Sequence, residues 1–209
     1  MDKTVSVEFN SKRLIFYGTV RGAYYEIDDL DKLFQENGFD LILLGISPEE
    51  LDGMKKYMEK PFDVELSDYE IIWGLKLRDL TKVKLPVPSY YHAVVYSIKN
   101  NVEIKAIDMN DDEYAKCFTR NVSFFDLLRH SLKKNRILKR RFRSKTPEEF
   151  SLEWDRIVNR GGYKKLEMER ERYMTERIRE NSKGNNILII IDFERMDNIV
   201  SSLKHQEKN

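Results

Sequence analysis

The chain has 209 residues, of which 41% are hydrophobic and 35% are charged, with 37 basic and 36 acidic side chains. This length predicts one domain covering residues 1–209, and the hydrophobic fraction is sufficient for a core. The net charge of +1 gives no overall attraction to nucleic acids or membranes, which argues against a dedicated nucleic-acid binder. No apolar run approaches the ~18 residues of a membrane span.

The cysteine content and the N-terminus indicate the compartment. Cys117 is the one cysteine of the chain, so an intramolecular disulfide is excluded and a reducing compartment is favoured. The first residues, MDKTVSVEFN, lack a signal-peptide pattern. Both observations predict a cytoplasmic protein. Cys117 lies in the helix-like stretch DDEYAKCF and is predicted to be a small buried hydrophobe rather than a nucleophile.

The N-terminal part alternates between strand and helix patterns. Residues 5–9 and 13–17 (RLIFY) predict two neighbouring strands. A helical period over residues 24–37 precedes a buried-type strand at 40–46 (DLILLGI). Ser47, followed by proline and two acids, then predicts a helix start. This order predicts an α/β fold with a central mixed, largely parallel sheet flanked by helices.

The remainder of the chain adds two strands and a long helical section. Residues 102–108 (VEIKAID) and 187–191 (ILIII) predict strands, and each is followed by or ends on an acid. Between them, about 115–162 predicts a helical insertion that caps the α/β core. A basic helix over 123–143 and a helix start at Thr146 belong to this section.

The ends of the predicted strands indicate where a site would form. In open α/β sheets, ligands bind outside the carboxyl ends of the strands. The residues at these exits are Arg21, Glu49, Asp108 and Asp192. Either the four residues form a mixed-charge crevice, or each of the three acids caps the helix that follows it.

A charged helix that begins at Tyr163 contains another candidate site residue, Arg170. Arg170 falls within the apolar face of this helix. A guanidinium in a buried stripe needs a carboxylate, a ligand or a route to water. Arg170 is therefore either part of a structural salt bridge or directed into a site.

The sequence predicts no cofactor and no metal centre. His92 and His130 lie on predicted helices and His205 in a tail, without paired metal-ligand spacing, so each is interpreted as an ordinary residue. An oxygen-only Mg²⁺ site built from Asp108, Asp111 and Asp112 is the one divalent-metal alternative.

The run 129–145 is strongly basic, with nine Lys or Arg and no acid. Its interleaved apolar residues predict a helix that packs on one side and is solvated on the other. The alternative is an anionic partner, either nucleic acid or an acidic protein surface. The candidate residues for such a partner are Lys133, Lys134, Arg136, Arg140, Arg141 and Arg143.

Five segments resemble, in order, the TraB/PrgY family and its relatives Tiki and ChaN. They read RLIFYGTVRG, FDLILLGIS, VEIKAIDMNDDEY, EMERERYMTERI and NILIIIDF, and they span roughly residues 12–203. The resemblance implies a TraB-like fold with ancestry in metal-dependent hydrolases. The residues that it carries over are Asp108, Glu169, Arg170, Tyr173 and Met174.

The chain departs from the family at the positions that would hold a metal. Arg21 stands where the family has the His of its first turn, residues 45–47 replace an acid, and residues 192–195 replace a Gly-His turn. The resemblance therefore implies a degenerate member that has lost the hydrolytic site.

Three functional hypotheses follow. The first is a protein that binds a protein partner or a small anionic ligand in the crevice where the family has its hydrolytic site. Its ligand-binding candidates are Arg21, Glu49, Asp108, Arg170, Tyr173 and Asp192. The second is a metal- or anion-dependent hydrolase rebuilt around Arg21, Asp108 and Arg170. The third is nucleic-acid binding through residues 129–145. The charged helices are also compatible with a homodimer.

Overall fold

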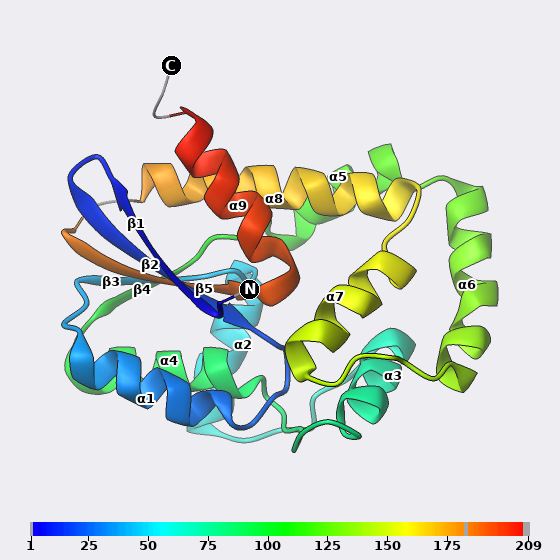
Figure 1. Cartoon of the computed structure of the whole chain (residues 1–209), viewed down its shortest axis with the longest axis horizontal. Helices are drawn as coiled ribbons and strands as arrows, with labels where there is room; N and C mark the ends of the chain where they lie inside the picture. The colour runs from blue at the N-terminus through cyan, green and yellow to red at the C-terminus, as the bar shows by residue number, and fades with distance from the viewer. Residues whose placement is uncertain (1, 182–183, 207–209) are drawn as a thin grey trace.

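The computed structural model of the chain describes residues 2–181 and 184–206, with side chains as far as Lys204. Its strands form a five-stranded sheet in the order β1-β2-β5-β3-β4 (Figure 1). They are β1 (Thr4–Phe9), β2 (Lys12–Thr19), β3 (Leu41–Leu44), β4 (Glu103–Ala106) and β5 (Asn186–Asp192). β1 pairs antiparallel with β2, and all the other neighbouring pairs are parallel. The predicted mixed, largely parallel α/β sheet is confirmed.

The central strand β5 explains why the sheet needs helices on both faces. Residues 187–191 have no exposed surface, and a strand that is buried on both sides reads as a continuous apolar run. One core lies between the sheet and the C-terminal helices, and the second lies under the N-terminal ones. In Figure 1, α8 and α9 cover one face, and α1, α2 and α4 cover the other.

The helices begin where local capping signals predict. The described helices are α1 (Glu26–Glu36), α2 (Pro48–Glu59), α3 (Asp68–Leu77), α4 (Pro88–Asn100), α5 (Asp111–Asn121), α6 (Phe124–Lys139), α7 (Pro147–Val158), α8 (Gly162–Glu180) and α9 (Phe193–Gln206). Ser47 and Thr146 accept hydrogen bonds from the backbone N–H groups of the third residue of α2 and α7. The helix starts predicted at these two residues are confirmed.

The predicted end of the basic helix was wrong. The basic helix α6 ends at Lys139 instead of continuing to residue 143. Beyond it the chain is irregular because the backbone N–H groups of Arg143 and Ser144 donate to the Glu153 carboxylate, at 2.9 and 3.1 Å. At the C-terminus α9 continues to Gln206. Residues 207–209 and the side chain of His205 lie outside the described part.

The junction between β5 and α9 positions the carboxyl edge of the sheet. Phe193 begins α9 directly after Asp192 ends β5. A Cβ atom on Gly18 of β2 would lie 2.7 Å from Phe193 Cδ2 and 3.3 Å from Phe193 Cα, so only glycine lets α9 begin this close to the strand. Gly22, with φ of +94°, forms the turn after β2. These two glycines allow the close approach and the turn that follow β2.

We predict that Gly18→Ala destabilises the protein by about 1–3 kcal/mol, because the added methyl group must displace the start of α9. Urea unfolding followed by circular dichroism measures the effect. Gly53→Ala is the matched control: Gly53 lies within α2, where an added Cβ atom would meet no other atom within 4 Å, and alanine there gains up to about 1 kcal/mol. Equal stability of the two variants would contradict the packing argument.

Candidate functional site

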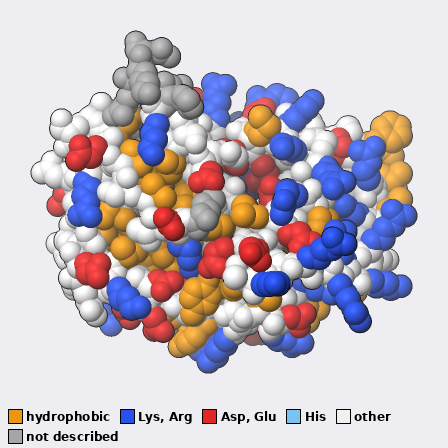
Figure 2. All heavy atoms as spheres, viewed as in Figure 1, with side chains coloured by type: hydrophobic (Ala, Val, Ile, Leu, Met, Phe, Trp, Pro, Cys, Tyr) orange, Lys and Arg blue, Asp and Glu red, His pale blue; other side chains and the backbone are white. Residues whose placement is uncertain are grey.

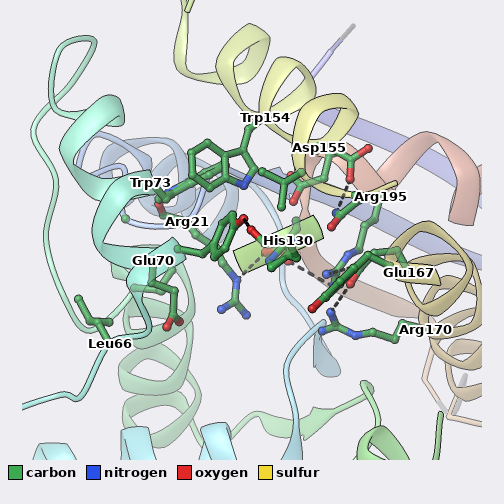
Figure 3. Close-up of a pocket in the computed structure, with 18 of the residues that line it drawn as sticks. Arg21, Leu66, Glu70, Trp73, His130, Trp154, Asp155, Glu167, Arg170 and Arg195 are labelled. Atoms are coloured by element: carbon green, nitrogen blue, oxygen red, sulfur yellow. Dashed lines mark hydrogen bonds and ion pairs between the residues drawn. The ribbon is translucent and has the colours of Figure 1, made fainter. Parts of the chain in front are cut away.

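A cavity of about 330 Å³ lies at the carboxyl ends of β2 and β5, below α3, α6 and α7 (Figure 3). Trp73 and Trp154 form an edge-to-face pair on one wall, with ring centroids 5.4 Å apart. The Trp73 indole N–H also donates to the backbone carbonyl of Arg21 at 2.8 Å, which ties α3 to the turn after β2. The wall is therefore rigid and largely aromatic.

An alternating series of charges, called here the ion network, lies on the opposite side of the cavity, and five of its seven members line the cavity. Its members, in the order in which they contact one another, are Glu50, Arg21, Asp192, Arg195, Glu167, Arg170 and Asp108. Neighbouring members of the series have opposite charges. The network joins the ends of β2, β4 and β5 to the helices α2, α8 and α9.

Asp192 is the most buried acid of the ion network. It accepts hydrogen bonds from Arg21 Nε and from the Tyr90 hydroxyl, each at 3.0 Å. Arg195 Nη1 lies 3.3 Å from its second oxygen. Burial acts to raise the pKa of Asp192, but the positive charges of Arg21 and Arg195 outweigh it, so the pKa lies below its usual value.

Arg170, on the apolar face of α8, has carboxylate partners. Its guanidinium pairs with the carboxylate of Asp108 and donates to Glu167 at 2.9 Å. It also lines the cavity (Figure 3). Burial acts to raise the pKa of Glu167, but Arg195 and Arg170 outweigh it and the pKa is lowered. Arg170 thus belongs to a buried salt bridge and faces the cavity as well.

Arg195, in the first turn of α9, is a site residue that the sequence analysis missed. Nη2 donates to Glu167 at 2.6 Å. The side chain is only 9% exposed. Within the described residues, its Nε and Nη1 atoms are buried without a hydrogen-bond acceptor of suitable geometry. An arginine three residues after the acid that ends a buried strand was the signal available in the sequence.

Glu194, which precedes Arg195, was also missed. It lines the cavity and accepts a hydrogen bond from the Ser151 hydroxyl of α7. Burial, followed by the negative charge of Asp192, raises its pKa to about 7, although Arg195 opposes the shift. A carboxyl group with this pKa can take up or release a proton near neutral pH.

Three of the predicted ligand-binding residues do not line the cavity: Asp108, which lies behind its partner Arg170, Glu49 and Tyr173. Glu49 is exposed, and it is the next residue of α2, Glu50, that contacts Arg21, with Oε2 3.2 Å from Nη2. Tyr173 packs beside the cluster of Cys117 and Leu166, and its hydroxyl donates to Glu113 at 2.9 Å. The structure therefore does not bring Glu49 and Tyr173 into this cavity, because the sequence does not show the rotation of a helix about its axis.

His130 lies on a helix, α6, as predicted, and its side chain also lines the cavity. Its ring lies between Tyr69 and Tyr163 of the cavity wall, with centroids 4.0 and 4.1 Å away. Burial and the nearby charge of Lys133 lower its pKa to about 4, so the imidazole is neutral at physiological pH. His92 lies on α4 as predicted, with Nε2 2.7 Å from an oxygen of Asp31.

No group of three or more His, Cys, Asp or Glu in the described residues is arranged to hold a metal ion. The alternative Mg²⁺ set is not assembled, because Asp111 and Asp112 are exposed in the first turn of α5 while Asp108 pairs with Arg170. Cys117 is buried, as predicted; burial, followed by Glu169, raises the pKa of its thiol.

The six basic candidates of the helical section have different surroundings. Lys133 Nζ donates to the carbonyl oxygen of Ile157, and Lys134 Nζ donates to Asp68 at 2.5 Å. Arg140 lies 3.8 Å from Glu153. The remaining residues, Arg136, Arg141 and Arg143, are exposed. Three of the six, Lys133, Lys134 and Arg140, therefore have partners within the protein.

No protein-family model matches this chain, and no curated protein matches its sequence. The resemblance to the TraB/PrgY family therefore stays a prediction. No helix in residues 2–181 and 184–206 is long and apolar enough to cross a membrane. The fold and the site define the class: an α/β domain with a capped, partly ionic cavity at the carboxyl edge of its sheet.

We predict that Arg170→Met destabilises the protein by about 3–5 kcal/mol, because it leaves the carboxylates of Asp108 and Glu167 buried without this partner. Arg172→Met on the same helix is the control. Arg172 makes an exposed i,i+4 pair with Glu176, whose loss costs about 0.5 kcal/mol or less. Urea unfolding of both variants measures the difference in the free energy of unfolding. Similar losses of stability in the two variants would show that Arg170 does not compensate buried charges.

We predict that the wild type loses stability relative to Glu194→Gln as the pH rises from about 5 to 8, by about 1–3 kcal/mol. Over this interval the folded protein retains a proton on Glu194 that the unfolded chain has already released, so raising the pH favours unfolding. Glutamine keeps an acceptor for Ser151 and does not titrate. Urea unfolding at the two pH values measures the effect, and a constant difference between the proteins would contradict a raised pKa.

Proposed function

We propose that the protein binds a small organic molecule with an acidic head and an aromatic or apolar body in the capped cavity. The observation that carries this proposal is Arg195. Its Nε and Nη1 atoms are buried beside the cavity, and neither makes a hydrogen bond of suitable geometry to a described residue, although Nη1 lies 3.3 Å from the Asp192 carboxylate. A buried donor without a partner costs about 1–3 kcal/mol, and more for a charged group. A ligand acceptor would remove that cost.

The hydrogen-bonding state of the ion network favours an acceptor on the ligand. Its carboxylates already contact the guanidinium groups of Arg21, Arg170 and Arg195. The buried atoms of the network without a hydrogen bond to a described residue, Arg195 Nε and Nη1, are donors. Glu167 and Asp192 hold the Arg195 guanidinium in place before any ligand enters, which lowers the entropy cost of binding.

The walls of the cavity favour a flat or apolar body. Trp73, Trp154 and the stacked Tyr69–His130–Tyr163 series surround the space above the ion network. A volume of about 330 Å³ lies at the small end of the range for ligand pockets. These features support the interpretation of the chain as a TraB-like protein that acts by binding rather than by hydrolysis.

The two tryptophans of the chain both line the cavity, so tryptophan emission is a direct reporter. We predict that phenylacetate and 3-phenylpropionate change this emission in a saturable manner, and that uncharged 2-phenylethanol binds at least about tenfold more weakly, because it cannot accept a charge-assisted hydrogen bond from Arg195. Isothermal calorimetry measures the same affinities independently.

Arg195→Lys is the test variant, because lysine keeps the positive charge of the ion network and removes the Nε and Nη1 donors. We expect it to weaken binding of the acids by about tenfold and to leave binding of the alcohol unchanged. Arg129→Lys, at an exposed position on α6, is the matched control. Equal affinity of wild type and Arg195→Lys for the acids, or no saturable response to any of the three probes, would overturn the proposal.

Glu194 favours a second function, a hydrolase with a rebuilt site. Its pKa of about 7 and its place on the cavity wall suit a general acid or base. Its test is the hydrolysis of nitrophenyl esters and phosphates between pH 5 and 9. A rate that changes near pH 7 in the wild type and is lost in Glu194→Gln supports catalysis, whereas equal rates in the two proteins argue against it.

A further inference from the structure

The solvent side of α6 exposes an unusual amount of apolar surface. Phe124 and Phe125 are each 73% exposed, Leu132 is 66% exposed and Leu128 is 49% exposed. Single exposed apolar residues are common, whereas a contiguous group of large ones marks an interaction site. We call these four residues the α6 apolar face.

The α6 apolar face is a stripe rather than a scatter. At about 100° per residue, its four members fall within an arc of about 100° on one side of the helix. Ile137, which is buried in the core, points away from this arc. α6 therefore packs by its inner side and presents a second apolar side to solvent.

Positive charge surrounds the α6 apolar face. On the same helical projection, Arg129 and Arg136 border the stripe and Lys139 lies within its arc near the C-terminal end. Asp126 is the one acid of α6, and its carboxylate accepts hydrogen bonds from the Ser123 N–H and hydroxyl at the helix N-terminus, at 3.2 and 2.6 Å. The outward side is thus apolar and cationic, with no outward-facing acid from α6.

The position of α6 makes this surface accessible. In Figure 1 it forms the edge of the molecule opposite the β1–β2 hairpin, beyond α3 and α7. Figure 2 shows hydrophobic side chains along that edge, with Lys and Arg side chains beside them. The apolar stripe therefore lies on a projecting helix at the rim of the molecule.

The chemistry of the surface selects among its possible occupants. A second copy of α6 would bring cationic residues against one another. Nucleic acid would pair with the arginines but leave two adjacent phenylalanines in water. An anionic bilayer accepts both groups, since apolar side chains enter the interface while Arg and Lys contact lipid phosphates at about 1 kcal/mol each.

We propose that α6 docks on the surface of an anionic lipid bilayer, with the helix axis parallel to the membrane and the α6 apolar face inserted. The attraction is local, because the whole chain carries a net charge of only +1 while residues 129–145 contain nine basic residues and no acid. The proposal does not depend on the ligand of the cavity.

The test is co-sedimentation of the full chain with lipid vesicles. We expect binding to vesicles of phosphatidylcholine mixed with phosphatidylglycerol, little binding to phosphatidylcholine alone, and weaker binding at higher salt. Phe124→Ser/Phe125→Ser should reduce the affinity at least tenfold, because two aromatic side chains no longer enter the interface. Arg129→Gln/Arg136→Gln should reduce it by a similar factor.

Two control variants separate this face from general surface effects. Ile98→Ser removes an apolar side chain that is 57% exposed on α4, and Arg172→Gln removes an exposed charge on α8. Neither should change vesicle binding. All the substituted side chains are exposed, so circular dichroism should show an unchanged fold.

Three results would overturn the proposal. One is an absence of sedimentation with the mixed vesicles, which would leave an acidic protein groove as the occupant. Another is equal binding by the wild type and Phe124→Ser/Phe125→Ser. The third is a concentration-dependent dimer in solution that this double variant abolishes, which would assign the face to a second copy of the chain.

Discussion

The arrangement of this protein depends on the contacts of one buried group, the carboxylate of Asp192. A charge at the end of a central strand costs several kcal/mol unless opposite charges and hydrogen bonds compensate it. Arg21 after β2, Arg195 in α9 and Tyr90 in α4 supply that compensation. Each comes from a different element, so satisfying one carboxylate fixes three segments around the carboxyl end of β5. The remainder of the ion network extends this constraint to the ends of β4 and α8.

The ion network also explains why a cavity persists at this edge. The guanidinium and carboxylate groups pair with one another. Apolar side chains that moved into the place of one of them would leave a charge unpaired. The aromatic wall opposite is fixed as well, through the Trp73 hydrogen bond to the Arg21 carbonyl and the packing of Trp154 against Trp73. The space between an ionic surface and an aromatic surface is thus bounded on both sides by groups with little freedom to move.

The helical section has two sides with different roles. Its inner side completes the cavity, with His130 of α6 and Trp154 of α7 in the wall. Its outer side carries the α6 apolar face beside basic residues. Both sides are present on α6, and His130 of α6 and Trp154 of α7 each pack against Tyr69 of α3. The basic run that the sequence analysis treated as one feature is divided by this arrangement: Lys133 and Lys134 contact α7 and α3, and Arg129 and Arg136 lie beside the apolar stripe.

The sequence by itself determined the strands, most helix starts and the edge of the sheet at which charged residues gather. These follow from local rules: apolar runs for buried strands, capping residues for helices, and the direction of parallel strands for the position of Arg21, Asp108 and Asp192. Only the tertiary structure decided which side chains meet there. Glu50 rather than Glu49 faces Arg21 because of the phase of α2, and Arg195 and Glu194 enter the site because β5 continues into α9 without a loop. Burial, which raises the pKa of Glu194, and the exposure of two phenylalanines on α6 depend on how distant segments pack, and no local pattern in the chain encodes that packing.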